Sequence, residues 1–172
     1  YFLIFNLEIL SPYLMMWESA ILVQGFGANM AITLTNSIIK SFESQSETEY
    51  PYESCGFIIG DYISSSKSIG SVYLPAKNIK HINAERRFLI DPKAYEQAES
   101  EAEKLGLSII SIVHSHPDHP DKPSEFDLNH AWPGFSYIII SVQKGNAVSF
   151  KSWKLNDDRT SFLEEDVVNK GE

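Results

Sequence analysis

The sequence predicts an α+β domain, and three observations support this prediction. Short apolar runs typical of strands alternate with segments that have helical spacing. Several neighbouring strand runs are separated only by short polar turns, which favours hairpins in a mixed sheet. The chain has 172 residues, of which 43% are hydrophobic and 22% are charged, and these values suit one folded domain with its own core.

The first part of the predicted domain contains a mixed segment followed by a hairpin. Residues 32–42 begin like a strand and continue with helical spacing, and we expect Thr35 or Asn36 to cap the helix. Residues 43–50 are polar and rich in Ser and Glu, so we expect an exposed connection there. The next expected elements are a strand, a turn and a returning strand, at residues 55–63, 64–68 and 71–74.

The clearest helix signal in the sequence begins at Asp91-Pro92. Asp is a favourable N-cap and Pro a favourable first helical residue. The Ala- and Glu-rich stretch runs to about Lys104, and Gly106 is the expected end. The other expected elements are a short helix at residues 124–132 and strands at residues 87–90, 107–113, 137–142, 147–155 and 161–168.

Residues 1–29 do not resemble the rest of the chain. This segment is apolar and aromatic and contains no Lys or Arg, so it lacks the basic start of a signal peptide. Polar and proline residues interrupt it, which makes it a poor transmembrane span. Met30 opens a stretch that resembles a natural start. We expect one domain at residues 30–172, and a leader that either precedes the true start or packs on the domain as an extra element.

Charge and cysteine content argue against several functions. The net charge is −9, whereas non-specific binding to nucleic acid or to an anionic membrane needs a basic patch, so we expect neither partner. Cys55 is the one cysteine, so the chain can form no internal disulfide and no Cys-rich zinc site. We therefore expect a cytoplasmic protein, with Cys55 as a small buried strand residue and not a nucleophile.

The segment from His114 to Pro117 carries the strongest chemical signal. In an extended chain, residues i and i+2 point to the same face, so His114 and His116 can reach one metal ion. Asp127 returns from the beginning of the next predicted helix. Two His and one carboxylate leave a fourth zinc position open for water, which is typical of a catalytic site. Zinc lowers the pKa of such a water to about 7.

A hydrolytic site of this kind also needs a proton acceptor, and Glu53 is the candidate. It lies just before the strand predicted at residues 55–63, where a side chain can be held at the edge of a sheet. A general base must come within hydrogen-bonding reach of the water that it activates. The alternative is that Glu53 is an ordinary surface carboxylate.

Together these features resemble the JAMM/MPN+ motif of zinc metalloproteases. Ten residues separate the second His from the Asp, and a Glu stands upstream, as in that motif. The resemblance covers roughly residue 30 to the C-terminus. The positions that match are, in chain order, Glu53, Cys55, Gly56, residues 88–92, His114, His116, Pro117, Ser124 and Asp127.

The resemblance implies both a fold and a set of roles. The fold would be a curved mixed sheet with helices packed around it, a JAMM and cytidine-deaminase-like architecture. One zinc ion with a bound water would be held by His114, His116 and Asp127. Glu53 would take a proton from the water and pass it to the leaving amine. Ser124 would donate a hydrogen bond to the tetrahedral oxyanion, a contribution of about 2.7–4 kcal/mol.

Four residues in or near the motif have open alternatives. Ser124 and Asp127 also fit a helix capping box, and the capping role can coexist with a catalytic one. His119 is expected to be exposed, because a fourth ligand would block the water position. His130 shares a helix face with Asp127 and either orients it or is a plain helix residue.

The compact chain resembles the short prokaryotic members of this family more than the eukaryotic deubiquitinases, which often carry insertions. The resemblance therefore implies cleavage of a peptide or isopeptide bond at the C-terminus of a ubiquitin-like or sulfur-carrier protein. A Gly-Gly tail of that protein would enter as an extended strand by edge pairing. The alternatives are a non-catalytic MPN scaffold, a RadC-type protein associated with DNA repair, and a phage tail-assembly peptidase.

Overall fold

A computed structural model describes residues 29–171, so the expected leader, residues 1–29, lies outside the described residues except for Asn29. The described range contains seven strands and three helices. No helix in this range is long and apolar enough to span a membrane. The elements are β1 (Ala31–Leu34), α1 (Asn36–Glu49), β2 (Cys55–Ser64), β3 (Lys67–Ala76), α2 (Pro92–Leu105), β4 (Ser108–Pro117), α3 (Glu125–His130), β5 (Ser136–Gln143), β6 (Asn146–Leu155) and β7 (Phe162–Asn169).

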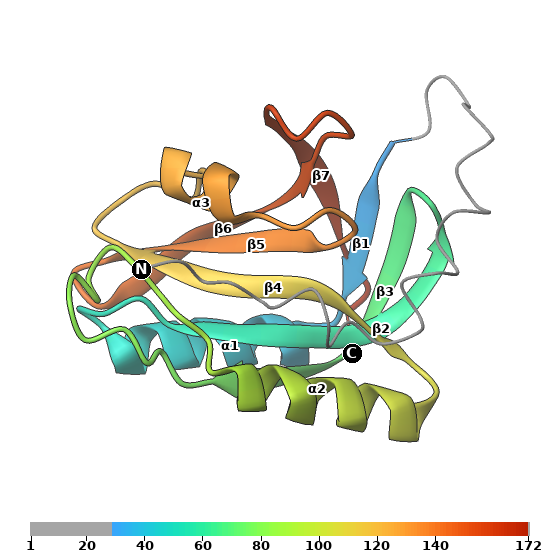
Figure 1. The fold of residues 1–172 in the computed structure, drawn as a ribbon, viewed down its shortest axis with the longest axis horizontal. Helices are drawn as coiled ribbons and strands as arrows, with labels where there is room; N and C mark the ends of the chain where they lie inside the picture. Colours follow the sequence, from blue (N-terminus) through green and yellow to red (C-terminus); the bar gives the residue numbers. More distant parts are fainter. Residues whose placement is uncertain (1–28, 172) are drawn as a thin grey trace.

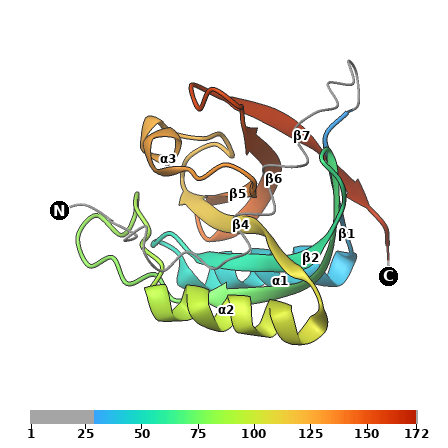
Figure 2. The same ribbon diagram turned by 45° about the vertical axis from the view of Figure 1, so that its right-hand side comes forward.

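The seven strands form one closed sheet in the order β1-β3-β2-β4-β5-β6-β7. β1 closes it because it pairs in parallel with both β3 and β7. β4 and β5 are also parallel, and the other neighbours are antiparallel. Figures 1 and 2 show the resulting curvature, with β7 and β1 bending round toward the β2–β3 pair. The predicted α+β fold with a curved mixed sheet is confirmed, while its closure was not predicted.

Helices α1 and α2 cover opposite faces of the central strands. Phe42 of α1 packs with Ile58 and with apolar residues of β1, β4 and β5. Ala98 and Ala102 of α2 pack on the other face, against Phe57 and its neighbours on β2. Consecutive strand residues point to opposite faces, so β2 contributes side chains to the hydrophobic clusters on both faces. The face that α2 covers also carries the functional site described below.

Helix α1 is longer than the sequence suggested. Residues 43–49, expected to form an exposed connection, continue the helix to Glu49. The side chain of Gln45 donates hydrogen bonds to the carbonyl oxygens of Cys55 (3.1 Å) and Ala76 (3.3 Å). Ser46 is buried, with an exposed fraction of 1%. These polar residues are helical because they bond to the strands beneath them, a tertiary effect that the local pattern does not contain.

A bulge in β4 decides which face its histidines occupy. The pairing with β2 skips Ile110, which becomes an extra residue. Ile110 packs in the hydrophobic cluster that α1 contributes to, whereas Ile112 packs against the cluster that α2 contributes to. These residues are two apart yet lie on opposite faces, because the extra residue reverses the alternation of side chains along the strand. His114 follows Ile112 by two and therefore lies on the α2 face. Gly60 pairs with Ser108, just before the bulge, and a Cβ added there would lie 2.7 Å from Cδ1 of Ile110.

Candidate metal centre and active site

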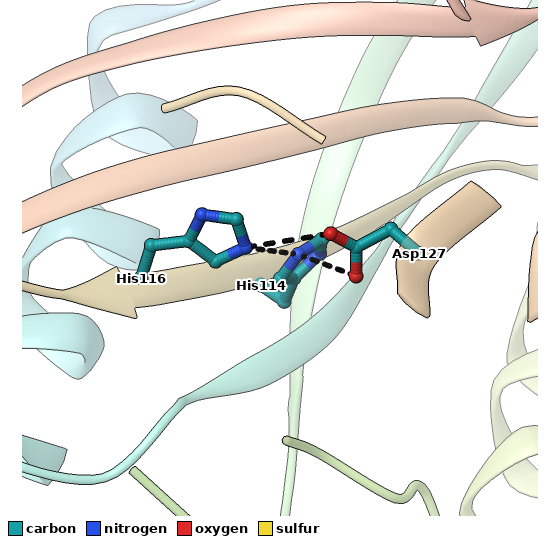
Figure 3. A group of neighbouring side chains, drawn as sticks. All are labelled: His114, His116 and Asp127. Carbon is teal, nitrogen blue, oxygen red and sulfur yellow. Dashed lines mark hydrogen bonds and ion pairs between the residues drawn. The ribbon is translucent and has the colours of Figure 1, made fainter. Parts of the chain in front are cut away.

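Strand β4 and helix α3 bring the three predicted metal ligands together. Nε2 of His114 lies 3.1 Å from Nε2 of His116, and the two imidazoles face the carboxylate of Asp127 (Figure 3). Nε2 of His114 is 3.4 Å from Oδ1 of Asp127, and Nε2 of His116 is 3.6 Å from its Oδ2. One ligand atom from each residue lies within 4.8 Å of the other two. Both His side chains are buried.

The separations between these atoms fit a tetrahedral zinc ion. Zinc–nitrogen and zinc–oxygen bonds are about 2.0–2.1 Å long, which places two tetrahedral ligand atoms about 3.3–3.4 Å apart. The separations of His114 Nε2 from His116 Nε2 (3.1 Å) and from Oδ1 of Asp127 (3.4 Å) lie around that value, and His116 Nε2 is 3.6 Å from the other oxygen, Oδ2. Two imidazole nitrogens and one carboxylate oxygen are also a donor set that suits zinc. The residues present therefore fit the ion that the motif implies.

Burial and hydrogen bonds give the two imidazoles different protonation behaviour. Nδ1 of His116 donates to the carbonyl oxygen of Pro120 at 2.8 Å, so a neutral His116 ring keeps its lone pair on Nε2. Burial lowers the pKa of His114 to about 4, so this ring is neutral at pH 7. Burial alone would lower the pKa of His116, but the hydrogen bond to Asp127 raises it above its usual value.

Asp127 stays ionised in this environment. Burial alone would raise its pKa, but the nearby His114 and the hydrogen bonds from His116 and Ser124 hold it well below the usual range. The centre therefore combines a carboxylate with a neutral His114 and a readily protonated His116. A metal ion would compete with the proton on His116, so metal affinity should fall with falling pH.

The loop between β4 and α3 is fixed by its own carbonyl groups. Three consecutive carbonyl oxygens, at residues 119–121, each accept a hydrogen bond from a side chain of a different strand. The bonds are those of Ser141 to His119 (2.7 Å), His116 to Pro120 (2.8 Å) and Trp153 to Asp121 (3.0 Å). The His119 side chain is exposed, as expected. This fixed loop leads to Asp127, the third predicted ligand, at the beginning of α3.

Ser124 caps α3 and bonds to Asp127. Its Oγ accepts from the backbone N–H of Asp127 at 3.2 Å, while its own N–H and Oγ donate to Oδ2 of Asp127 at 2.6 and 2.7 Å. The capping-box alternative is therefore confirmed, and the oxyanion role of Ser124 stays a prediction. His130 bonds to the carbonyl oxygen of Phe126 at 2.8 Å, which makes it a plain helix residue.

Glu53 enters the site from a different part of the chain. Its exposed fraction is 5%, so it is not a surface carboxylate. Burial raises its pKa to about 8, against an opposing effect of His116. The backbone N–H of Glu53 donates to the carbonyl oxygen of Ala84 at 2.8 Å, and the carbonyl oxygen of Glu53 accepts from Nδ2 of Asn78 at 2.8 Å. The loop after β3 therefore holds this residue on both sides.

A buried pair of serines joins Glu53 to the histidines. The backbone N–H of Ser54 donates to Oγ of Ser115 at 2.8 Å, and the N–H of Ser115 donates to the carbonyl of Ser54 at 3.1 Å. Ser115 stands between the two His ligands, so these bonds tie the entry of β2 to the ligand-bearing end of β4. Sequence reasoning had assigned no role to Ser115, although its place inside the His-x-His segment was a signal.

The sequence reasoning assigned no role in the site to three further residues. Phe88 stacks on the His114 ring with centroids 4.7 Å apart, and the guanidinium of Arg87 lies 4.2 Å from the centroid of Phe126. Asn78 bonds to both Glu53 and Arg87. The strand expected at residues 87–90 is only a single bridge between Asn78 and Ile90. One sequence contains no periodic signal for these contacts, because they depend on the path of a loop.

The curved mixed sheet, with two His on one strand and an Asp on the following helix, is the arrangement that the resemblance to the JAMM/MPN+ family implied. The family model described as "Prokaryotic homologs of the JAB domain" matches residues 35–156, which is most of the chain. This protein belongs to that family, and the resemblance to the JAMM/MPN+ family is confirmed.

Three curated relatives align with parts of the chain. A Haloferax volcanii protein named desampylase is 28% identical over 116 residues, 66% of this chain and 79% of the relative. A "Probable TtuB-protein conjugate cleaving protease" of Thermus thermophilus is 36% identical over 69 residues, 40% of this chain and 46% of the relative. Tail tip assembly protein K of Escherichia phage N15 is 33% identical over 89 residues, 52% of this chain but 32% of the relative.

Two solution structures share the fold. Protein DSY2949 of Desulfitobacterium hafniense superimposes with a TM-score of 0.71 at 28% identity, over 82% of this chain and 94% of that protein. A protein of Salinibacter ruber gives a TM-score of 0.64 at 33% identity, over 80% of this chain and 90% of that protein. The match spans nearly the whole of both proteins, so the single-domain α+β architecture is common to all three.

Proposed function

We propose that this domain is a zinc-dependent hydrolase that cuts a peptide or isopeptide bond at the C-terminus of a ubiquitin-like or sulfur-carrier protein. The observation that carries the proposal is the meeting of His114, His116 and Asp127. The buried carboxylate of Glu53, just before β2, lies near enough that the charges of His116 and Asp127 shift its pKa. The substrate class comes from two relatives, whose names are desampylase and TtuB-protein conjugate cleaving protease.

His114, His116 and Asp127 would hold the zinc ion and leave one position open. A zinc ion bound there would polarise the scissile carbonyl and lower the pKa of the attacking water to about 7. The bond from His116 to Pro120 keeps that ring oriented, and the bonds from Ser124 keep the Asp127 carboxylate oriented. The rigid loop at residues 119–121 supports this half of the site.

Glu53 would move the proton and Ser124 would stabilise the oxyanion. The raised pKa of Glu53 makes it a stronger base than an exposed Glu, and a nearby cation would bring that pKa back toward neutral. It would accept a proton from the attacking water and deliver it to the leaving amine. The Ser124 hydroxyl would turn from Asp127 to donate to the oxyanion as negative charge develops on it.

The substrate tail cannot add to a long free edge of the described sheet, because its strands close on one another. A Gly-Gly tail would instead pair with short stretches of backbone beside Glu53 and the loop after β3. Small residues next to the scissile bond suit a site in which Glu53 and both His are buried and Asp127 and Ser124 are half-buried.

Metal content is the first test. Elemental mass spectrometry of the purified protein should find about one zinc per chain, and a His114→Ala, His116→Ala double variant should lose it. The zinc-loaded protein should also release a fluorophore amide-linked to the Gly-Gly tail of a ubiquitin-like protein, and a chelator should stop the release. A protein that stays metal-free after zinc reconstitution would contradict the proposal and favour the non-catalytic scaffold.

The match to phage protein K supports a second candidate, a peptidase that acts in tail assembly. The same three ligands and Glu53 would serve that reaction, so the site does not separate the two substrates. Neighbouring genes separate them, because sulfur-carrier and adenylating-enzyme genes favour the first candidate and tail genes the second. The scaffold alternative expects the metal ligands to be missing, whereas this chain has all three.

A further inference from the structure

The segment between β3 and α2 is basic in an otherwise acidic protein. The whole chain has 14 Lys and Arg against 23 Asp and Glu. Residues 77–87, which we call the basic loop, contain four Lys or Arg and one Glu. The four are Lys77, Lys80, Arg86 and Arg87. This reversal of sign gives the protein one local region that can attract an acidic partner.

The basic loop has a defined shape because hydrogen bonds join its two ends. Oδ1 of Asn78 accepts from the N–H of Lys80 (2.9 Å) and of Leu89 (3.1 Å). Nδ2 of Asn78 donates to the carbonyl oxygen of Arg87 at 3.1 Å, and the N–H of Ile79 donates to the carbonyl oxygen of Leu89 at 2.9 Å. The cations are therefore presented on an ordered scaffold.

The basic loop adjoins the proposed site at Ala84 and at its last residue, Arg87. Ala84 accepts the hydrogen bond from the backbone of Glu53. Arg87 lies over Phe126 of α3, and the next residue, Phe88, stacks on His114. A protein whose tail reaches Glu53 must therefore pass directly against this loop.

An exposed apolar residue stands among the cations. Ile82 has an exposed fraction of 74%, the largest among the exposed large hydrophobic residues of the described range. Tyr52, next to Glu53, is 51% exposed. Apolar side chains surrounded by charged ones are typical of a surface that binds another protein.

We propose that the basic loop docks an acidic face of the ubiquitin-like protein whose tail is cut, with Ile82 packing on an apolar spot in that face. The inference rests on the proposed function for the nature of the partner. Charge complementarity selects an acidic partner, because the rest of this acidic protein repels such a surface and the loop attracts it. The loop therefore supplies both orientation and selectivity.

The first experiment uses the unmodified, zinc-loaded full chain and two probes. One probe is fluorescently labelled ubiquitin, and the other is a ubiquitin variant in which exposed lysines around the tail are replaced by glutamate. Fluorescence anisotropy should show the acidic probe binding about tenfold more tightly at about 0.05 M salt. That preference should shrink to about twofold or less at about 0.5 M salt, because screening removes it.

Two triple variants with the same change in net charge test the location. Lys77→Glu, Lys80→Glu, Arg86→Glu reverses the basic loop and leaves Arg87 in place. Lys40→Glu, Lys67→Glu, Lys170→Glu reverses exposed lysines on other surfaces. The loop variant should bind the acidic probe about tenfold more weakly at low salt, and the control should stay within about twofold. Ile82→Ser should weaken binding several-fold at either salt concentration.

Two outcomes would overturn the docking proposal: equal weakening in both triple variants, or no preference for the acidic probe by the unmodified protein. Hydrolysis is measured in parallel with a short Gly-Gly peptide amide and with the two protein probes carrying amide-linked fluorophores. Loop-dependent binding without hydrolysis would support docking and contradict the proposed function. Hydrolysis of every substrate without a preference for the acidic protein would support the function and contradict docking.

Discussion

The two halves of the site are built in different ways. The ligand half comes from one continuous segment, residues 114–127, and its three ligands interact with one another. The half that supplies Glu53 is assembled from separate segments, with Asn78 and Ala84 holding the backbone around it. Apart from the bonds between Ser54 and Ser115, the predicted metal ligands and the predicted proton acceptor are therefore held by different contacts. Substitutions should therefore separate metal binding from proton transfer.

Removing a ligand should abolish both properties. Asp127→Ala leaves two buried imidazoles without their carboxylate, so we expect loss of zinc and no detectable hydrolysis. Glu125→Ala, on the same helix and exposed, is the matched control and should keep both. Metal analysis and a fluorogenic assay provide the measurements. Zinc retained at full stoichiometry in Asp127→Ala would exclude Asp127 as a ligand.

Removing the proton acceptor should separate the two properties. Glu53→Gln keeps the size of the side chain but cannot accept a proton, so zinc content should stay near that of the unmodified protein. Hydrolysis should fall by about 10²- to 10⁴-fold, the usual contribution of general acid–base catalysis. Metal analysis and kcat measured on the same sample provide the check. Activity within a few-fold of the unmodified protein would rule out Glu53 as the base.

Substituting Ser124 should affect both catalysis and folding stability. Ser124→Ala removes the proposed oxyanion donor, so kcat should fall by about 10²-fold, with KM little changed. It also removes the cap of α3, which should cost about 1 kcal/mol of folding free energy. Ser124→Thr retains the hydroxyl and should recover most of both. A loss of stability without a loss of kcat would leave Ser124 with its capping role alone.

The stability of the metal-free protein should report the buried state of Glu53. Its pKa of about 8 in the folded state lies above the usual value of 4.5, so the folded state binds the proton more tightly. Stability from this group is therefore present below pH 4.5 and is lost as pH rises through 8. Glu53→Gln should match the unmodified protein near pH 4.5 and exceed it by on the order of 2 kcal/mol near pH 8. Thermal unfolding across that range would test it, and a constant difference would contradict it.

The smallest effect is expected from removing the first 29 residues. We propose that residues 30–172 are sufficient for folding and activity, and a chain that begins at Met30 should match the full chain in kcat and within about 0.5 kcal/mol in stability. Met30 has to be kept, because its carbonyl accepts from the N–H of Asp166 at 2.9 Å. An insoluble or inactive product would show that the preceding residues pack on the domain.

Features that depend on neighbouring residues were predictable from the sequence. Helix α2 begins after the Asp91 cap and ends at Gly106, whose φ of 66° suits glycine. The turn between β2 and β3 lies within residues 64–68, where it was expected. The fold class followed from the order of the elements. The His114 and His116 pair shares a face because a strand has a period of two. The spacing to Asp127 likewise belongs to a short, continuous segment.

Tertiary structure decided the features that join distant segments. The second half of α1 is helical because Gln45 bonds to two strands, and the bulge at Ile110 selects the face that carries the histidines. The closure of the sheet by β1 and the support of Glu53 by Asn78 also link residues far apart in the chain. Such contacts leave no periodic trace in one sequence, because each depends on how loops and strands meet only after the core has formed.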